Sequence, residues 1–299
     1  MKENKPLQQL NGRTGGFYFA VTIALYVILS FVGQAIMGAV AEKTSTVYLA
    51  VCSTFSAVSF FIVIAYALFF AKQPTKCIVG QSFGLKFIPL AIILSCGMFL
   101  GLGYVNNAIA EVFIGWGANI KSPLDEITID LGKLIVFSIT VALLPAISEE
   151  LFFRGIILNS LSGVKQVYAV LISALCFALY HCSVAQLVYQ FIYGVALGFL
   201  FITVKSVLPC IIAHFANNFS VLLLRYLKVE INLYSLTIIM IGVACLAVFS
   251  ALVYLLLKKG KKQEKEIKTE KGEITRFFFP YAMFAIIICV ALAIGSLVG

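Results

Sequence analysis

Long apolar stretches alternate with short polar connections along the whole chain of 299 residues. A run of about 20 apolar residues is enough for a helix to cross a bilayer. Because lipid offers the backbone no hydrogen-bond partners, a chain of such runs folds as a bundle of helices. We therefore predict an all-α, polytopic membrane protein with about eight to nine transmembrane helices. The predicted spans are 17–41, 47–71, 87–105, 132–147 continuing into 148–163, 166–183, 184–204, 207–224, 233–257 and 277–298.

The polar connections divide the spans but leave no room for a separate soluble domain. The stretch 121–130 predicts an extramembrane loop, and 258–276 predicts a basic cytoplasmic linker. Eight of the 22 Lys and Arg residues lie in that linker. Because basic residues gather on the cytoplasmic side of a membrane, this distribution favours a cytoplasmic N-terminus in the cell membrane. We interpret 1–299 as a single multi-pass membrane domain.

Composition narrows the class of protein further. Apolar residues make up 62% of the chain and charged residues 12%, and the mean hydropathy is +1.04. These values exclude an ordinary soluble domain. The net charge of +9 follows from basic residues that flank apolar spans, so we expect the lipid bilayer as partner and no nucleic acid. The eight cysteines show no CxxC spacing and predict small buried thiols.

Ionisable residues inside the predicted spans are the candidates for chemistry. A charge in hydrocarbon is costly unless it pairs or faces water, so it marks a functional site by default. Glu150 and Arg154 lie four residues apart and predict an ion pair on one helical face. The neighbouring Glu149 projects in another direction and stays available for chemistry. A plain charge pair at a helix end is the alternative.

The chain contains two histidines, and both lie in apolar spans. His181 shares a helical face with Phe177, and His214 shares one with Asn218. Each pair alone is also explained by hydrogen bonding and packing between membrane helices. Together with the acids they suit hydrolysis of an acyl bond in either of two ways. In the first, Glu149, His181 and His214 hold a zinc ion that keeps one position open for water. In the second, a glutamate activates water without a metal, and His and Asn donors stabilise the oxyanion.

Three short motifs follow one another in this part of the chain. They are EExxxR (Glu149, Glu150, Arg154), FxxxH (Phe177, His181) and HxxxN (His214, Asn218). In this order they resemble the motifs of the CPBP family, the CAAX-processing and bacteriocin-processing intramembrane proteases, also called the Abi family or type II CAAX prenyl endopeptidases. The glycines of FIYGVALG, Gly194 and Gly198, are similar to the usual phrasing of that family. The resemblance covers about 130–225, which we take as the catalytic core.

The resemblance implies a role for each motif residue. Glu149 is expected to be the general base that activates water, with Glu150 and Arg154 supporting it. His181 is expected to position the water or the substrate carbonyl, and His214 with Asn218 to form the oxyanion site. The family has been described both as metal-dependent and as metal-free. We favour no cofactor, with zinc as the alternative, because HExxH is absent and Asn is an uncommon zinc ligand.

The predicted function is therefore that of an intramembrane endopeptidase that acts on a membrane-associated peptide or protein. The alternative is a non-enzymatic membrane protein, such as a bacteriocin immunity protein, a scaffold or a transporter. One conflict remains within the predicted spans. If each span crosses once, Glu149 lies near the inner face, while His181 lies about 24 Å along a helix that enters from that face. The two residues meet only if 132–163 is bent, tilted or re-entrant, or if the neighbouring spans are offset.

Overall fold

A computed structural model describes residues 10–42, 45–71, 75–82, 84–118, 120, 127–260 and 272–298. These residues form helices and connections, with an isolated bridge between Gly80 and Ser206. Within this part of the chain, eight helices are long and apolar enough to cross a membrane, and the apolar helix Gln166–Tyr180 is shorter. The predicted all-α, polytopic membrane fold is confirmed. Parts of the predicted loop and linker, 121–126 and 261–271, lie outside the described residues.

The helices follow the apolar runs of the sequence closely. Their bounds are α1 (Gly12–Val40), α2 (Thr46–Ala65) with the π-helical η1 (Tyr66–Phe70), α3 (Thr75–Val79), the 3-10 turn η2 (Leu85–Phe87), α4 (Ile88–Gly115), α5 (Leu131–Phe137), the π-helical η3 (Ser138–Leu143), α6 (Leu144–Glu150), the π-helical η4 (Leu151–Leu158), α7 (Gln166–Tyr180), α8 (Leu187–Val204), α9 (Leu208–Leu227), α10 (Leu236–Gly260), α11 (Glu273–Phe277), the π-helical η5 (Phe278–Ala282) and α12 (Met283–Val298).

The segment that carries the two acids is one long helix, Leu131–Leu158, made of α5, η3, α6 and η4. Asp130 caps its start, where Oδ1 accepts a hydrogen bond from the Lys133 backbone N–H at 2.8 Å. This bond lowers the pKa of the Asp130 carboxyl, which lies outside the span. Pro145 lies in the first turn of α6, directly after the π-helical η3. Because proline has no N–H to donate, the wider π-helical turn accommodates it without ending the helix.

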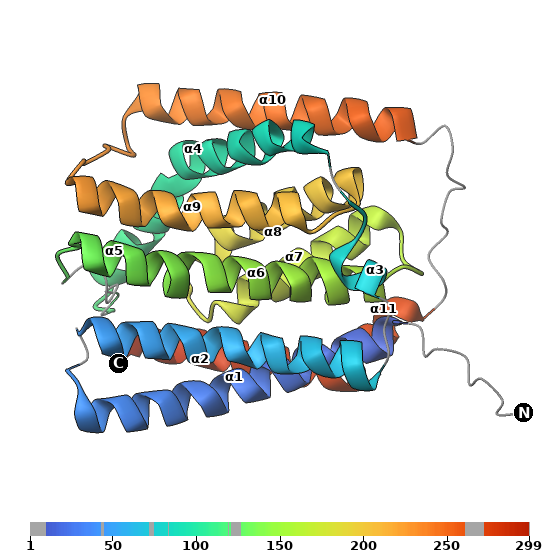
Figure 1. The fold of residues 1–299 in the computed structure, drawn as a ribbon, viewed down its shortest axis with the longest axis horizontal. Coiled ribbons are helices and arrows are strands. Elements are labelled where there is room, and N and C mark those ends of the chain that lie inside the picture. The colour runs from blue at the N-terminus through green and yellow to red at the C-terminus, as the bar shows by residue number, and fades with distance from the viewer. Residues whose placement is uncertain are drawn as a thin grey trace, which may run out of the picture.

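This long helix lies inside the bundle, where α6 contacts α2 on one side and α9 on the other (Figure 1). Its aromatic side chains join the surrounding helices. The Phe60 ring of α2 lies 5.1 Å from the Phe152 ring, and the Phe153 ring lies 5.3 Å from the Phe177 ring of α7. All four rings are fully buried. They form the apolar surroundings of the acid pair.

Glu149 and His181 lie at different distances from the ends of their helices, and their depths in the membrane stay a prediction. The long helix ends at Leu158, so Glu149 lies roughly 14 Å inside that end at 1.5 Å per residue. The next helix, α7, begins at Gln166 and is too short to match the other spans. His181 directly follows α7 and lies about 22 Å from the start of that helix. The run from 132–147 into 148–163 forms one continuous helix to Leu158, as predicted, and both Glu149 and His181 interact with His214 and Arg154.

Candidate active site

Glu149 and Glu150 are the last residues of α6, immediately before the helix widens into η4. Both side chains are buried, with 6% of Glu149 and none of Glu150 exposed. Arg154 follows one turn later and is also fully buried. Two carboxylates and one guanidinium in an apolar interior need close partners, because an unpaired buried charge is strongly unfavourable. The hydrogen-bond and ion-pair partners of each carboxylate therefore decide whether it is held in place or free to react.

The predicted ion pair between Glu150 and Arg154 is confirmed. Nη1 of Arg154 donates to Oε1 of Glu150 at 2.9 Å. Nη2 of Arg154 donates to the Gly194 backbone carbonyl of α8 at 3.2 Å. The guanidinium also lies over the Phe177 ring of α7, 4.6 Å from its centroid. Arg154 thus joins the helix of the acids to α7 and α8 and holds Glu150 in place.

The same Glu150 oxygen binds the first imidazole. Nδ1 of His214, on α9, lies 2.8 Å from Oε1 of Glu150. Since a carboxylate beside an arginine accepts hydrogen bonds, Nδ1 must carry the proton of the neutral ring. The Nε2 atom is then an acceptor in neutral His214 and a donor when the ring is protonated. The His214 ring lies against the rings of Phe177 and Tyr193, at 5.8 and 6.0 Å.

The second imidazole is fixed at the end of α7. Nδ1 of His181 lies 2.8 Å from the Phe177 carbonyl oxygen. A carbonyl only accepts, so here too Nδ1 donates and Nε2 of the neutral ring is an acceptor. The helix ends here because Cys182 adopts the left-handed conformation, with φ of 46°. The two positions of the FxxxH motif therefore contact each other twice, since the Phe177 and His181 rings also lie 4.9 Å apart.

Glu149 differs from Glu150 in its contacts. The buried Oε2 atoms of both acids lack a hydrogen-bond partner among the described residues, but Oε1 of Glu150 is held by Arg154 and His214, which form no such bond with Glu149. Its electrostatic neighbours are His214, Glu150 and Arg154, and His181 in turn interacts with His214 and Arg154. The structure thus gathers all five ionisable motif residues into one cluster. His214 contacts Glu150 directly, an arrangement that the spacing of the motifs did not indicate.

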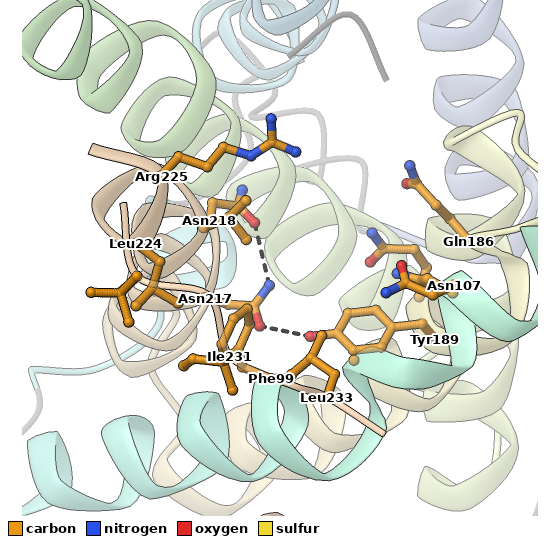
Figure 2. A pocket seen from close by; sticks show the side chains of 15 residues that line it. Phe99, Asn107, Gln186, Tyr189, Asn217, Asn218, Leu224, Arg225, Ile231 and Leu233 are labelled. Atoms are coloured by element: carbon orange, nitrogen blue, oxygen red, sulfur yellow. Dashed lines mark hydrogen bonds between the residues drawn. The ribbon is translucent and has the colours of Figure 1, made fainter. Parts of the chain in front are cut away.

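Asn218, the last residue of the HxxxN motif, belongs to a series of hydrogen-bonded side chains. The Tyr189 hydroxyl of α8 donates to Oδ1 of Asn217 at 2.7 Å, and Nδ2 of Asn217 donates to Oδ1 of Asn218 at 3.5 Å (Figure 2). Asn217 is buried and Asn218 is half-buried. These hydrogen bonds orient the Asn218 side chain. Because Oδ1 of Asn218 accepts from Asn217, the Nδ2 group of Asn218 has both of its protons available for other acceptors. Asn218 lies one turn after His214 on α9.

The zinc alternative requires Glu149, His181 and His214 to converge on one point. Across the part of the chain that the structure describes, no group of three or more His, Cys, Asp or Glu side chains is arranged to hold a metal ion. Nδ1 of each imidazole is engaged, with Glu150 or with the Phe177 carbonyl, and Nε2 of each ring stays available as a ligand. The described side chains are nevertheless not arranged around one point as a zinc site requires.

Comparison with known proteins agrees with the position of this cluster. Residues 131–220 match the family model described as type II CAAX prenyl endopeptidase Rce1-like. The match covers every motif residue and lies within the predicted core, 130–225. No curated protein and no solved structure matches the chain.

Two tyrosines of the site were not anticipated from the sequence. Tyr189 binds Asn217, and the Tyr193 ring lies between Tyr189 and His214. They are four residues apart on α8, so their common face is visible in the sequence. The spacing of Tyr189 and Tyr193 does not show which neighbouring helix this face of α8 contacts. Asn217 projects away from the helical face that His214 and Asn218 share, and in the structure it supports Asn218.

Proposed function

We propose that this protein is an intramembrane endopeptidase that hydrolyses a peptide bond of a membrane-associated peptide or protein. The match at 131–220 supports a protease at the level of the family. The mechanism rests on the contrast between two adjacent acids. Oε1 of Glu150 is held by Arg154 and His214, whereas neither of those two residues forms a hydrogen bond with Glu149 among the described contacts. Glu149 is therefore the carboxylate that can exchange a proton with water.

In the proposed reaction the Glu149 carboxylate takes a proton from a water molecule. The water oxygen forms a bond to the carbonyl carbon of the substrate, and the carbonyl oxygen becomes an oxyanion. The protonated Glu149 then gives its proton to the leaving nitrogen as the C–N bond breaks. The products are a carboxylic acid and an amine, and Glu149 is again a carboxylate.

The imidazoles and Asn218 have complementary roles in this scheme. Nε2 of His181 accepts a hydrogen bond from the water and so positions it. Nε2 of His214 donates to the oxyanion when the ring is protonated. The Nδ2 group of Asn218 is the second donor to the oxyanion. Glu150 and Arg154 position these groups without contacting the reacting atoms.

Comparison of the peptides in cells that carry wild type or Glu149→Gln tests the function. We expect specific cleavage products in the wild-type cells that are absent with Glu149→Gln, because the amide cannot accept the proton of water. Loss of general base catalysis lowers rates by about 10²–10⁴-fold. His181→Ala and His214→Ala should abolish the same products at equal protein abundance.

Identical peptide profiles in wild-type and Glu149→Gln cells would favour the non-enzymatic alternative. Full cleavage by His181→Ala would remove that residue from the mechanism while leaving Glu149 in place. Reintroduction of wild-type protein into the Glu149→Gln cells is the control, because it must restore every missing product.

A further inference from the structure

A cavity of about 490 Å³ lies beside the candidate active site, between α4, α8 and α9. It begins at Asn217 and Asn218, one turn beyond His214, and extends along α9 to Arg225. At 1.5 Å per residue this length of α9 is about 12 Å. Volumes of roughly 300–1,000 Å³ are typical of pockets that hold a small ligand. The cavity is therefore large enough for a short segment of extended chain.

Six of the side chains that line this cavity are carboxamides. The amides are Asn106 and Asn107 of α4, Gln186 and Gln190 at the start of α8, and Asn217 and Asn218 of α9. Asn107 and Gln186 lie on one side of the cavity and Asn217 and Asn218 on the other (Figure 2). The Asn106 Oδ1 atom is buried and has no hydrogen-bond partner among the described groups.

Carboxamides match one ligand chemistry particularly well. Each amide side chain both donates and accepts hydrogen bonds, as each unit of a peptide backbone does. An extended peptide has no internal hydrogen bonds, and in lipid every unsatisfied backbone group costs several kcal/mol. A substrate drawn into a membrane site must therefore find its partners on the enzyme. A lipid tail, by contrast, gains nothing from a wall of amides.

We propose that this cavity binds the backbone of the substrate on one side of the scissile bond. Asn107, Gln186 and Gln190 supply hydrogen bonds to an extended segment that leads to Asn218. At about 3.3 Å per residue, the 12 Å length accommodates three to four residues. Leu224 and Val221 of α9 are among the apolar residues of the wall and contact the substrate side chains. The inference deepens the proposed function and rests on it for the identity of the ligand as a substrate.

Peptide binding to the purified Glu149→Gln protein in detergent tests the inference without catalysis. The probes are fluorescein-labelled hexapeptide pools with random sequences, one amidated and one with a free carboxylate at the C-terminus, followed by fluorescence anisotropy. We expect saturable binding that is weakened about tenfold, or roughly 1.4 kcal/mol, by Gln190→Leu or Asn107→Leu. Gln166→Leu is the matched control, because Gln166 is exposed at the start of α7 and should bind as tightly as the parent.

The two pools also show whether a terminal carboxylate adds affinity at the Arg225 end of the cavity. Absence of saturable binding of both pools up to about 1 mM would overturn the inference. So would equal binding by the parent and both cavity variants, or cavity-dependent binding of a fluorescent lysophospholipid in place of peptides.

Failure of the inference and of the proposed function can be told apart. If the wild-type protein cleaves peptides and the cavity variants have the same KM, the cavity inference is wrong and the proposed protease function is retained. If peptides bind in the cavity but the wild-type protein cleaves none of them, the proposed protease function is wrong and the cavity is a peptide-binding site with another role.

Discussion

Two adjacent residues of the same type have different roles in this site because their partners differ. Glu150 is held by a guanidinium and an imidazole, each within 3 Å of one oxygen, and it maintains the structure around it. Glu149, one position earlier, lies near the same groups but forms neither of these hydrogen bonds, and it is the acid that transfers the proton in the proposed mechanism. A buried charge is tolerated when it is paired, and removal of one partner leaves the other uncompensated. The role of each acid therefore follows from its surroundings.

Glu150→Gln is expected to destabilise the fold strongly. The substitution keeps the shape of the side chain but leaves the fully buried Arg154 without its counter-charge. Such a loss costs about 3–5 kcal/mol. Thermal unfolding in detergent measures it. The control is Glu111→Gln on the exposed surface of α4, where Tyr234 donates to the carboxylate and the expected change is small. An unchanged melting temperature for Glu150→Gln would contradict the structural role.

Chelation of divalent metal ions is expected to leave the cleavage activity unchanged. The described His, Cys, Asp and Glu side chains do not form a set that could hold a metal ion. Overnight dialysis of the purified protein against EDTA, followed by an assay of a reporter taken from the peptide comparison, measures this. A loss of activity that stoichiometric zinc restores would contradict the metal-free mechanism.

At the scale of elements, the site depends on close approach between α7 and α8. Gly194 of α8 faces Ala174 of α7, where a β-carbon would lie 3.0 Å from the Ala174 Cα atom. Small residues at such a crossing let helix backbones approach in a membrane. The carbonyl of the same glycine accepts the hydrogen bond from Arg154. Gly194 thus links helix packing to the position of the buried charge cluster.

Gly194→Ala is expected to lower both stability and activity. The added methyl group pushes α8 away from α7, and overpacking of this kind costs about 1–3 kcal/mol. The displaced carbonyl also weakens the anchor of Arg154. Gly38→Ala on α1 is the matched control, since a β-carbon there meets nothing within 4 Å. If the two variants unfold at the same temperature, α7 and α8 tolerate the extra volume and the packing argument is wrong.

At the scale of the whole molecule, the two ends of the bundle differ in the residues that they bring together. Gly15 near the start of α1 packs against Ser160, after the end of η4, and Gly198 near the end of α8 packs against Val170 near the start of α7. The start of α1, the connection between η4 and α7 and the connection between α8 and α9 therefore lie at one end of the bundle, and the α9–α10 connection lies at the other (Figure 1). The orientation of these ends in the membrane stays a prediction.

A cytoplasmic N-terminus is tested by labelling cysteines in intact cells. In a variant without native cysteines, Lys165→Cys should react with a membrane-impermeant maleimide only after lysis. Asn232→Cys, in the α9–α10 connection, should react in intact cells. The expectation follows from the gathering of basic residues on the cytoplasmic side. The reverse pattern would invert the orientation and leave the fold unchanged.

The sequence by itself determined the class of fold, most helix positions and the residues of the candidate site. Apolar runs require helices in lipid, and the i,i+4 spacing of Glu150 and Arg154 allows an ion pair. Both features depend only on residues close together in the sequence, so they can be predicted from it. Only the tertiary structure decided which side chains meet across helices. The contact of His214 with Glu150, the support of Asn217 by Tyr189 and the amide-lined cavity depend on the offset and rotation of neighbouring helices. Those quantities are set by packing between segments distant in sequence, which no spacing within one helix encodes.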